Sequence, residues 1–448
     1  MSDIAIGALC LAASLVLIQS GMNIGVALML LSFVGVWSIK GLVIAGKLLA
    51  SSVATSIASD AYAVIPLFVL MGLFVSATNM GRDTFDVAAR LLRGLSGGLG
   101  IATVAANAVF AACTGTTIAS ASVFTKVAVP EMVRHGYTPN FSVGVVAGSS
   151  VLGMLIPPSI LMIIFGVIAN VSIADLFTSG IVPGILMAAA FCGTIMLLGR
   201  TYTDFVVVDP KALHGRYAGV LDEAPIWMLG VKFLPIVILV GTVLGGIYGG
   251  FFTPTEAGGA GALAAFLIAL ARRELTPRIF WEVALETGRV TAAICFLLMA
   301  AALYSQMLTL SGLPFAVGQW LESSGLHLLP ILIGYLFVVV LLGCFLDSVS
   351  IMLIVLPFVI PVFEGFGVNL IWLGLISVMA IEIGLLTPPL GIAIFVVKAN
   401  LDDQRITTWQ VFSGTAPMTL TMVLVLTLSV LFPWLALALV GDAGWSWW

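Results

Sequence analysis

The sequence predicts an all-α polytopic membrane protein made of two inverted repeats, each with a re-entrant helical hairpin and a broken helix. Three observations lead to this fold class: the composition, two double prolines inside long apolar segments, and a series of glycines and prolines that occurs twice. Of the 448 residues, 61% are hydrophobic and 8% are charged, whereas a soluble domain has about 45–50% apolar and about 25% charged residues. The apolar stretches are about 20 residues long, which favours transmembrane helices over the shorter strands of a barrel.

The composition also argues against several functions. The net charge of −4 says nothing useful about nucleic acid, which is not among the expected partners. The five cysteines lack the close spacing of a metal site or a disulfide framework, and no glycine-rich loop ends in Lys followed by Ser or Thr. A membrane enzyme would need His, Cys or paired carboxylates gathered at one depth, and no such set can be assembled. We therefore expect no cofactor and no catalytic residue.

Residues 1–62 are expected to form N-terminal scaffold helices. The first apolar stretch, 4–20, has no basic region before it and continues directly into a second stretch at 22–38. It is therefore expected to be a retained helix and not a cleaved signal peptide. The Ser-rich segment 41–61 is ambiguous, and its placement is left open.

Two apolar segments are too long for one plain crossing. Residues 141–170 would form a helix of about 45 Å, longer than a hydrocarbon core of about 30 Å requires. Pro157-Pro158 lies near its middle, and Pro388-Pro389 occupies the same place in 371–400. Proline interrupts the helical hydrogen-bond ladder, and a broken helix at membrane depth is tolerated where the freed backbone lines a cavity or binds a ligand.

The chain also repeats itself. Gly81 and Gly312 are 231 residues apart, and the same separation relates the two double prolines. Glycine and proline mark backbone geometry, so an ordered series at one offset indicates that one shape is built twice. Further pairs at this offset are Pro130 with Pro361, Gly136 with Gly367, and Gly153 with Gly384.

Each repeat contains a predicted hairpin. Residues 99–113 and 117–134 meet at a polar tip around Thr114 to Thr117, and 327–345 and 348–364 meet around Asp347 and Ser348. Five apolar crossings separate the hairpins: 141–170, 173–198, 229–250, 255–271 and 279–311. Because this number is odd, the hairpins enter from opposite faces and the repeats are inverted. Inverted repeats with broken helices are typical of secondary transporters, whose site lies at the repeat interface.

The basic residues agree with this topology. The connections on the second hairpin's side, near 170–173, 250–254, 311–327 and 363–369, contain no Lys or Arg. By the positive-inside rule, the first hairpin's side is cytoplasmic. The basic residues on that side are Arg82, Arg90, Arg93, Arg134, Arg200, Lys211, Arg216, Arg272, Arg273, Arg278, Lys398 and Arg405.

These features predict four regions. Residues 1–62 are the scaffold helices, and 63–227 are the first repeat, with a hairpin near 99–134, the broken helix 141–170 and a connecting loop at 199–225. Residues 228–440 hold linker helices and the second repeat, with a hairpin near 327–364 and the broken helix 371–400. Residues 441–448 are a C-terminal tail.

The hairpin tips and the helix breaks are the candidate sites. Helix N-termini there favour an anion, and freed carbonyls with hydroxyls favour a hard cation such as Na⁺ over a transition metal. The candidate cation ligands read from the residues are Thr116, Thr117, Ser149, Ser150, Gly153, Asp347, Ser348, Gly384 and Thr387. The candidate substrate residues are Thr116, Ser159, Ser350, Pro158 and Pro389. These small polar groups could instead cap helices or pack against neighbours.

Three acidic residues have competing interpretations. Asp347 lies within an apolar region, which makes it a functional candidate by default, yet it could equally be the N-cap of the second hairpin arm. Glu256 follows Thr253 and Pro254 as in a capping box, so a cap is favoured. Glu382 lies near the second break and could face a partner or a water-filled crevice.

Several motifs resemble the large M subunit of tripartite ATP-independent periplasmic (TRAP) transporters, over roughly residues 60 to 420. They are Thr114 to Ala119 (TGTTIA), Gly153 to Ser159 (GMLIPPS), Leu176 to Gly184 (LFTSGIVPG), Gly246 to Gly258 (GIYGGFFTPTEAG), Phe345 to Asp347 (FLD) and Glu382 to Pro389 (EIGLLTPP). Many members have Asn where this chain has Ala380 and Ala393, which leaves fewer polar side chains near the second break.

The resemblance implies the rest of a transport system. It implies a bacterial inner-membrane permease that works with a small four-helix membrane subunit, expected as a separate chain, and a periplasmic substrate-binding protein. It implies Na⁺-coupled import of a carboxylate such as a C4-dicarboxylate, a keto acid or a sugar acid, by an elevator mechanism. It adds Gly115 and Ile156 to the expected cation sites. The alternative is a standalone ion-coupled anion symporter or antiporter of related fold.

Overall fold

The computed structural model describes residues 2–92, 94–208, 225–401, 403, 405–441 and 445. Within these residues the regular structure is helical apart from one isolated bridge between Tyr137 and Val207. The basic residues Arg93, Lys211 and Arg216, and most of the predicted loop 199–225, lie outside the described part.

Seven helical spans in the described chain are long and apolar enough to cross a membrane, or up to eight if a bent pair of helices forms one span. Five of them are the crossings expected between the two hairpins: Pro139–Ala169, Ile173–Thr201, Trp227–Tyr248, Pro254–Ala271 and Pro277–Ser311. A sixth, Ser348–Gly365, qualifies by length, although it is one arm of a hairpin. The multi-pass helical fold class is therefore confirmed.

The N-terminal region contains three helices, α1 (Asp3–Gln19), α2 (Ile24–Lys40) and α3 (Leu42–Ile57). The Ser-rich segment, which sequence alone left open, is thus mostly helix α3. It is followed by η1 (Asp60–Ala63) and α4 (Val64–Ser76). The chain bends by 53° between α3 and the segment formed by η1 and α4. Gly41 joins α2 to α3 with a φ of 88°, a conformation that favours glycine.

The first repeat follows the predicted plan. Its elements are α5 (Met80–Leu92), the hairpin α6 (Gly98–Thr114) and α7 (Thr117–Arg134), the broken helix α8 (Pro139–Ser150), α9 (Leu152–Leu155) and α10 (Ile160–Ala169), then α11 (Ile173–Thr201) and the short α12 (Thr203–Val206). Three helices then lead to the second repeat: α13 (Ile226–Tyr248), α14 (Pro254–Ala271) and α15 (Pro277–Ser311). Thr253 and Glu256 form the predicted capping box at the start of α14.

The second repeat has the same sequence of elements. They are α16 (Leu313–Ser323), the hairpin α17 (Leu328–Gly343) and α18 (Ser348–Gly365), the broken helix α19 (Leu370–Leu385) and α20 (Ile392–Ala399), then α21 (Thr408–Leu431) and α22 (Trp434–Leu437). Helices α7 and α18 begin at Thr117 and Ser348, 231 residues apart, the separation found in the sequence.

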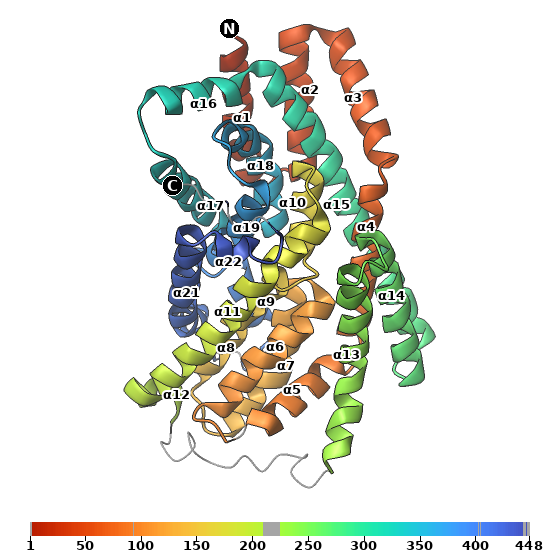
Figure 1. Ribbon diagram of the computed structural model, residues 1–448, viewed down its shortest axis with the longest axis vertical. Helices are drawn as coiled ribbons and strands as arrows, with labels where there is room; N and C mark the ends of the chain where they lie inside the picture. The colour runs from red at the N-terminus through yellow and green to blue at the C-terminus, as the bar shows by residue number, and fades with distance from the viewer. Residues whose placement is uncertain are drawn as a thin grey trace.

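The two hairpins lie in opposite halves of the view, while the rest of the two repeats interleaves (Figure 1). Helices α5, α6 and α7 occupy the lower part of the view, and α16, α17 and α18 occupy the upper part. This arrangement is what an odd number of crossings between the hairpins requires.

The helices pack in two groups. Helix α15 contacts α1, α2, α3 and α4, and α14 contacts α4 and α13, so the N-terminal and linker helices form one framework. The broken helices and α6 pack on α11 and α21, α7 packs on α8, and α17 packs on α19. Helix α18 packs on α10 and α19 and also contacts α15 of the framework. The candidate site belongs to this second group.

Candidate functional site

The first break forms where the double proline ends helical hydrogen bonding. Helix α9 ends at Leu155, and Ile156 is extended with ψ of 125°. Helix α10 restarts at Ile160, with Ser159 as N-cap and its hydroxyl accepting from the Met162 N–H at 3.4 Å. Proline has no N–H to donate and restricts the preceding residue, so these positions leave backbone groups free for other partners.

The first hairpin tip lies directly against this break. The Ile160 N–H donates to the Gly115 carbonyl at 3.3 Å. Gly115 has a φ of 63°, and a Cβ there would lie 2.7 Å from the Pro158 carbonyl oxygen. A Cβ at Gly153 would lie 2.6 Å from the Thr116 carbonyl oxygen. Glycine is therefore required at both positions for the tip and the break to touch.

The second repeat makes the same kind of contact. The Gly391 N–H donates to the Cys344 carbonyl at the second tip, at 3.3 Å. A Cβ at Gly384, the equivalent of Gly153, would lie 2.6 Å from the Gly343 Cα. Each hairpin is thus held against its own broken helix by backbone contacts.

The two tips also meet one another through Glu382. Thr117 donates its hydroxyl to Glu382 Oε2 at 2.6 Å, and Ser348 donates to Oε1 at 3.2 Å. Glu382 is only 1% exposed and lies in the last turn of α19, just before the second break. Thr117 and Ser348 are the equivalent first residues of α7 and α18. The carboxylate therefore lies between two helix N-termini from opposite repeats.

Several predicted ligands serve as helix caps. Thr116 caps α7 by accepting from the Ala119 N–H at 3.2 Å. Asp347 caps α18 by accepting from the Ser350 N–H at 3.1 Å, and it also accepts the Ser350 hydroxyl. The N-cap interpretation of Asp347 is therefore confirmed. These caps fix the orientation of the N–H groups at each tip.

Other predicted hydroxyls bond within their own helices. Ser149, Ser150 and Thr387 each donate to a carbonyl three or four residues earlier, at 2.7 Å. Ser149 also accepts from Asn107 Nδ2 at 2.6 Å. Asn107 is fully buried on α6, and its Oδ1 has no hydrogen-bond partner in the described chain. Sequence reasoning missed Asn107, although an amide in the apolar run 98–114 was the available signal.

The two breaks, which contain predicted substrate residues, differ in exposure. Pro157, Pro158 and Ser159 are buried, whereas Pro388 and Pro389 are exposed. A cavity of about 600 Å³ lies elsewhere, between α3, η1, the end of α10 and α15, and is lined by residues such as Tyr62, Asn170 and Gln306. None of the predicted site residues lines it.

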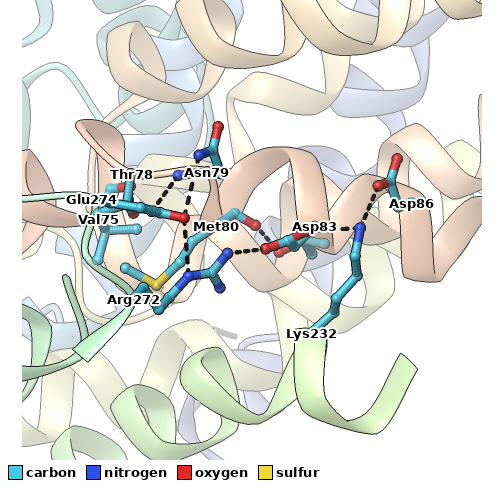
Figure 2. Close-up of polar contacts among 10 residues, drawn as sticks. Val75, Thr78, Asn79, Met80, Asp83, Asp86, Lys232, Arg272 and Glu274 are labelled. Carbon is cyan, nitrogen blue, oxygen red and sulfur yellow. Dashed lines mark hydrogen bonds and ion pairs between the residues drawn. The ribbon is translucent and has the colours of Figure 1, made fainter. Parts of the chain in front are cut away.

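A separate polar network holds α5 to the framework (Figure 2). Asp83 on α5 pairs with Arg272 at the end of α14 and with Lys232 on α13 at 3.0 Å. Lys232 also reaches Asp86 at 2.9 Å, and Arg272 Nε reaches Glu274 at 3.1 Å. Burial alone would lower the pKa of Arg272, but the hydrogen bond and charge of Asp83, with those of Glu274, raise it.

Glu274 extends this network to the start of α5. It accepts from the backbone N–H of Asn79 at 2.9 Å and from Asn79 Nδ2 at 3.2 Å. Asn79 and Glu274 lie 195 positions apart in the chain. The charges of the amphipathic helix are visible in the sequence, but nothing in the sequence indicates which residues they pair with.

Comparisons with known proteins agree with this geometry. A profile of the family described as "Tripartite ATP-independent periplasmic transporter, DctM component" matches residues 11–435. A C4-dicarboxylate TRAP transporter large permease of Pseudomonas aeruginosa is 34% identical over 337 residues, which cover 75% of this chain and 76% of that protein. An ectoine/5-hydroxyectoine TRAP transporter large permease of Ruegeria pomeroyi is 31% identical over 84% of this chain and 85% of that protein.

The fold is also similar to a solved structure. The YdaH transporter of Alcanivorax borkumensis superposes with a TM-score of 0.62, covering 91% of this chain and 90% of that one. The sequence identity is 15%, so this likeness concerns the fold alone.

Proposed function

Because this chain belongs to the DctM family of TRAP transporter large permeases, we propose that it imports an organic anion by Na⁺-coupled secondary transport. It is a multi-pass inner-membrane permease and not an enzyme. The specific anion, the coupling ion and the mode of movement are the parts that we propose.

One observation carries the proposal: Thr117 and Ser348 begin equivalent helices in opposite repeats and converge on one point. These two helix N-termini, brought together by their shared contact with Glu382, provide N–H groups and partial positive charge beside which a substrate carboxylate can bind. The hydroxyls and the carbonyls freed at the breaks provide hard oxygen ligands for Na⁺. The site can therefore hold an anion and a cation close together, which symport requires.

The coupling follows from how the tips are built. A cation bound between a tip and a break, at Gly115 and Gly153 or at Ser348 and Gly384, would fix the tip against its broken helix. A fixed tip presents its N–H groups to the substrate carboxylate, and binding of the substrate then pays no further entropy cost for ordering the tip. Na⁺ would thus favour the state that binds the anion, and differential affinity of this kind is what shifts a conformational equilibrium.

We further propose an elevator movement and two partners. The group formed by the hairpins, broken helices, α11 and α21 would move against the framework of α1 to α4 and α13 to α15. The partners are a small four-helix membrane subunit and a periplasmic binding protein that delivers the anion. The relatives are named for C4-dicarboxylate and for ectoine transport, so the partner binding protein is expected to select the substrate.

Reconstitution tests this function. Proteoliposomes containing the chain with its small membrane subunit should accumulate a labelled carboxylate only when an inward Na⁺ gradient and the binding protein are both present. A K⁺ gradient of equal size is the control for ionic strength and membrane potential. Full uptake without the binding protein would favour a standalone symporter, and uptake that ignores Na⁺ would contradict the proposed coupling.

A further inference from the structure

Among the described residues, Glu382 has no cationic partner. Its carboxylate is buried in α19 and accepts two hydrogen bonds, from Thr117 and Ser348. No ion pair joins it to Lys, Arg or His within the part of the chain that the structure describes. Two neutral hydroxyls satisfy some of its lone pairs but supply no opposite charge.

An isolated buried carboxylate is costly to keep ionised. Moving such a group out of water without a counter-charge is strongly unfavourable, so buried charges in proteins are paired or bind metal ions. Ionisable groups at membrane depth usually face a substrate or ion pathway for this reason. A cation bound beside Glu382 would supply the opposite charge that no Lys, Arg or His of the described residues provides.

The neighbouring groups are suitable ligands for such a cation. When Thr117 and Ser348 donate to the carboxylate, each hydroxyl oxygen keeps lone pairs that can accept. Ser120 lies one turn after Thr117 on the same face of α7, is fully buried, and its hydroxyl has no hydrogen-bond partner in the described chain. Carboxylate and hydroxyl oxygens without His or Cys suit a hard ion such as Na⁺.

We infer that Glu382 binds a coupling cation between the two hairpin tips, with the hydroxyls of Thr117 and Ser348 as further ligands. This inference rests on the proposed function. It differs from the sites expected at each tip and break, because those sites lie within one repeat and this one joins both. It also has no counterpart in the first repeat, where Val151 occupies the equivalent position 231 residues earlier.

A cation shared by both tips has a mechanical consequence. Its release would leave a bare carboxylate between two hairpin tips, each of which contacts the break of its own repeat, while α7 also packs on α20 and α18 on α10. Its binding would hold α7, α18 and α19 together as one unit. The site therefore couples the two repeats to each other and not only each tip to its own break.

The test compares Glu382→Gln with Glu364→Gln in the permease purified with its small membrane subunit. Glu364 is exposed at the end of α18 and serves as the matched control. Binding of ²²Na⁺ at equilibrium and the Na⁺ dependence of uptake are measured for both. We expect Glu382→Gln to bind one Na⁺ fewer and to need about tenfold or more Na⁺ for half-maximal uptake, because a charged ligand is lost. The control should match the wild type.

A second variant covers the case in which Glu382→Gln does not fold. Glu382→Asp keeps the charge but shortens the side chain, so it should still bind Na⁺ at the same stoichiometry and with lower affinity. Wild-type Na⁺ stoichiometry and affinity in Glu382→Gln, or unchanged affinity in Glu382→Asp, would overturn the inference while leaving Na⁺-driven uptake intact. Absence of Na⁺ dependence in the wild type would instead refute the proposed function.

Discussion

Replacing Asp83 with asparagine should detach helix α5 from the framework at measurable cost. Asp83 is the shared partner of Arg272 and Lys232, and its side chain is 9% exposed, while theirs are 24% and 27% exposed. Exposed ion pairs contribute about 0.2–1 kcal/mol, and breaking a buried pair costs about 3–5 kcal/mol. Because Asp83 is buried and Arg272 and Lys232 are partly exposed, we expect Asp83→Asn to lower the free energy of unfolding by about 2 kcal/mol, between these two ranges.

Equilibrium unfolding in mixed micelles with increasing sodium dodecyl sulfate measures this loss. Glu286→Gln is the matched control, because it removes the ion pair with Arg289 at the surface. The side chains of Glu286 and Arg289 are 50% and 75% exposed, so this variant should leave the free energy of unfolding unchanged. The penalty of Asp83→Asn should persist at high salt, since partly buried pairs are screened less than exposed ones. If Asp83→Asn is as stable as the control, the network does not anchor α5 and the reasoning fails.

Three further predictions follow from the site. Thr117→Ala and Ser348→Ala should each raise the Na⁺ concentration for half-maximal uptake. Thr427→Ala, the control, removes an exposed hydroxyl bonded within its own helix and should leave this concentration unchanged. An equal Na⁺ response in all three variants would count against a role of the tips. Gly153→Ala and Gly384→Ala should each cost about 1–3 kcal/mol through overpacking and reduce uptake, whereas Gly334→Ala, with no atom within 4 Å of its Cβ, should be tolerated. Arg134 and Glu364 lie at the ends of the two hairpins and are exposed. Single cysteines at these two positions should be labelled by an impermeant maleimide from opposite sides of the membrane. Labelling of both from the same side would refute the inversion of the repeats.

The parts of the fold that local backbone chemistry determines could be predicted from the sequence. The double prolines marked both breaks because proline cannot continue a helical ladder wherever it lies in the fold. Thr253 and Glu256 marked a helix start because a capping box involves residues three apart. The segment 41–61 remained ambiguous because its serines can bond to backbone inside a helix or outside it. Its bend of 53° depends on packing that the sequence does not state.

The polar contacts at the site could not be predicted in the same way. Thr117 and Glu382 are 265 positions apart, and Asp83 and Arg272 are 189 apart. No periodicity links such pairs, because they arise only when separate helices pack together. From the sequence, Glu382 was therefore one of three acidic residues with competing interpretations, and it was not among the candidate cation ligands. Sequence reasoning could identify where backbone groups are freed, but not which side chain the two tips share.

The repeats are symmetric in backbone and asymmetric in chemistry, and the asymmetry indicates how the two halves divide their tasks. The first break is buried at Pro157 and Pro158, while the second is exposed at Pro388 and Pro389. The single carboxylate that contacts both tips comes from the second repeat, and the first repeat has Val151 in its place. At the proposed cation site, the first half therefore contributes a neutral hydroxyl, that of Thr117, whereas the second half contributes both a hydroxyl and the negative charge of Glu382.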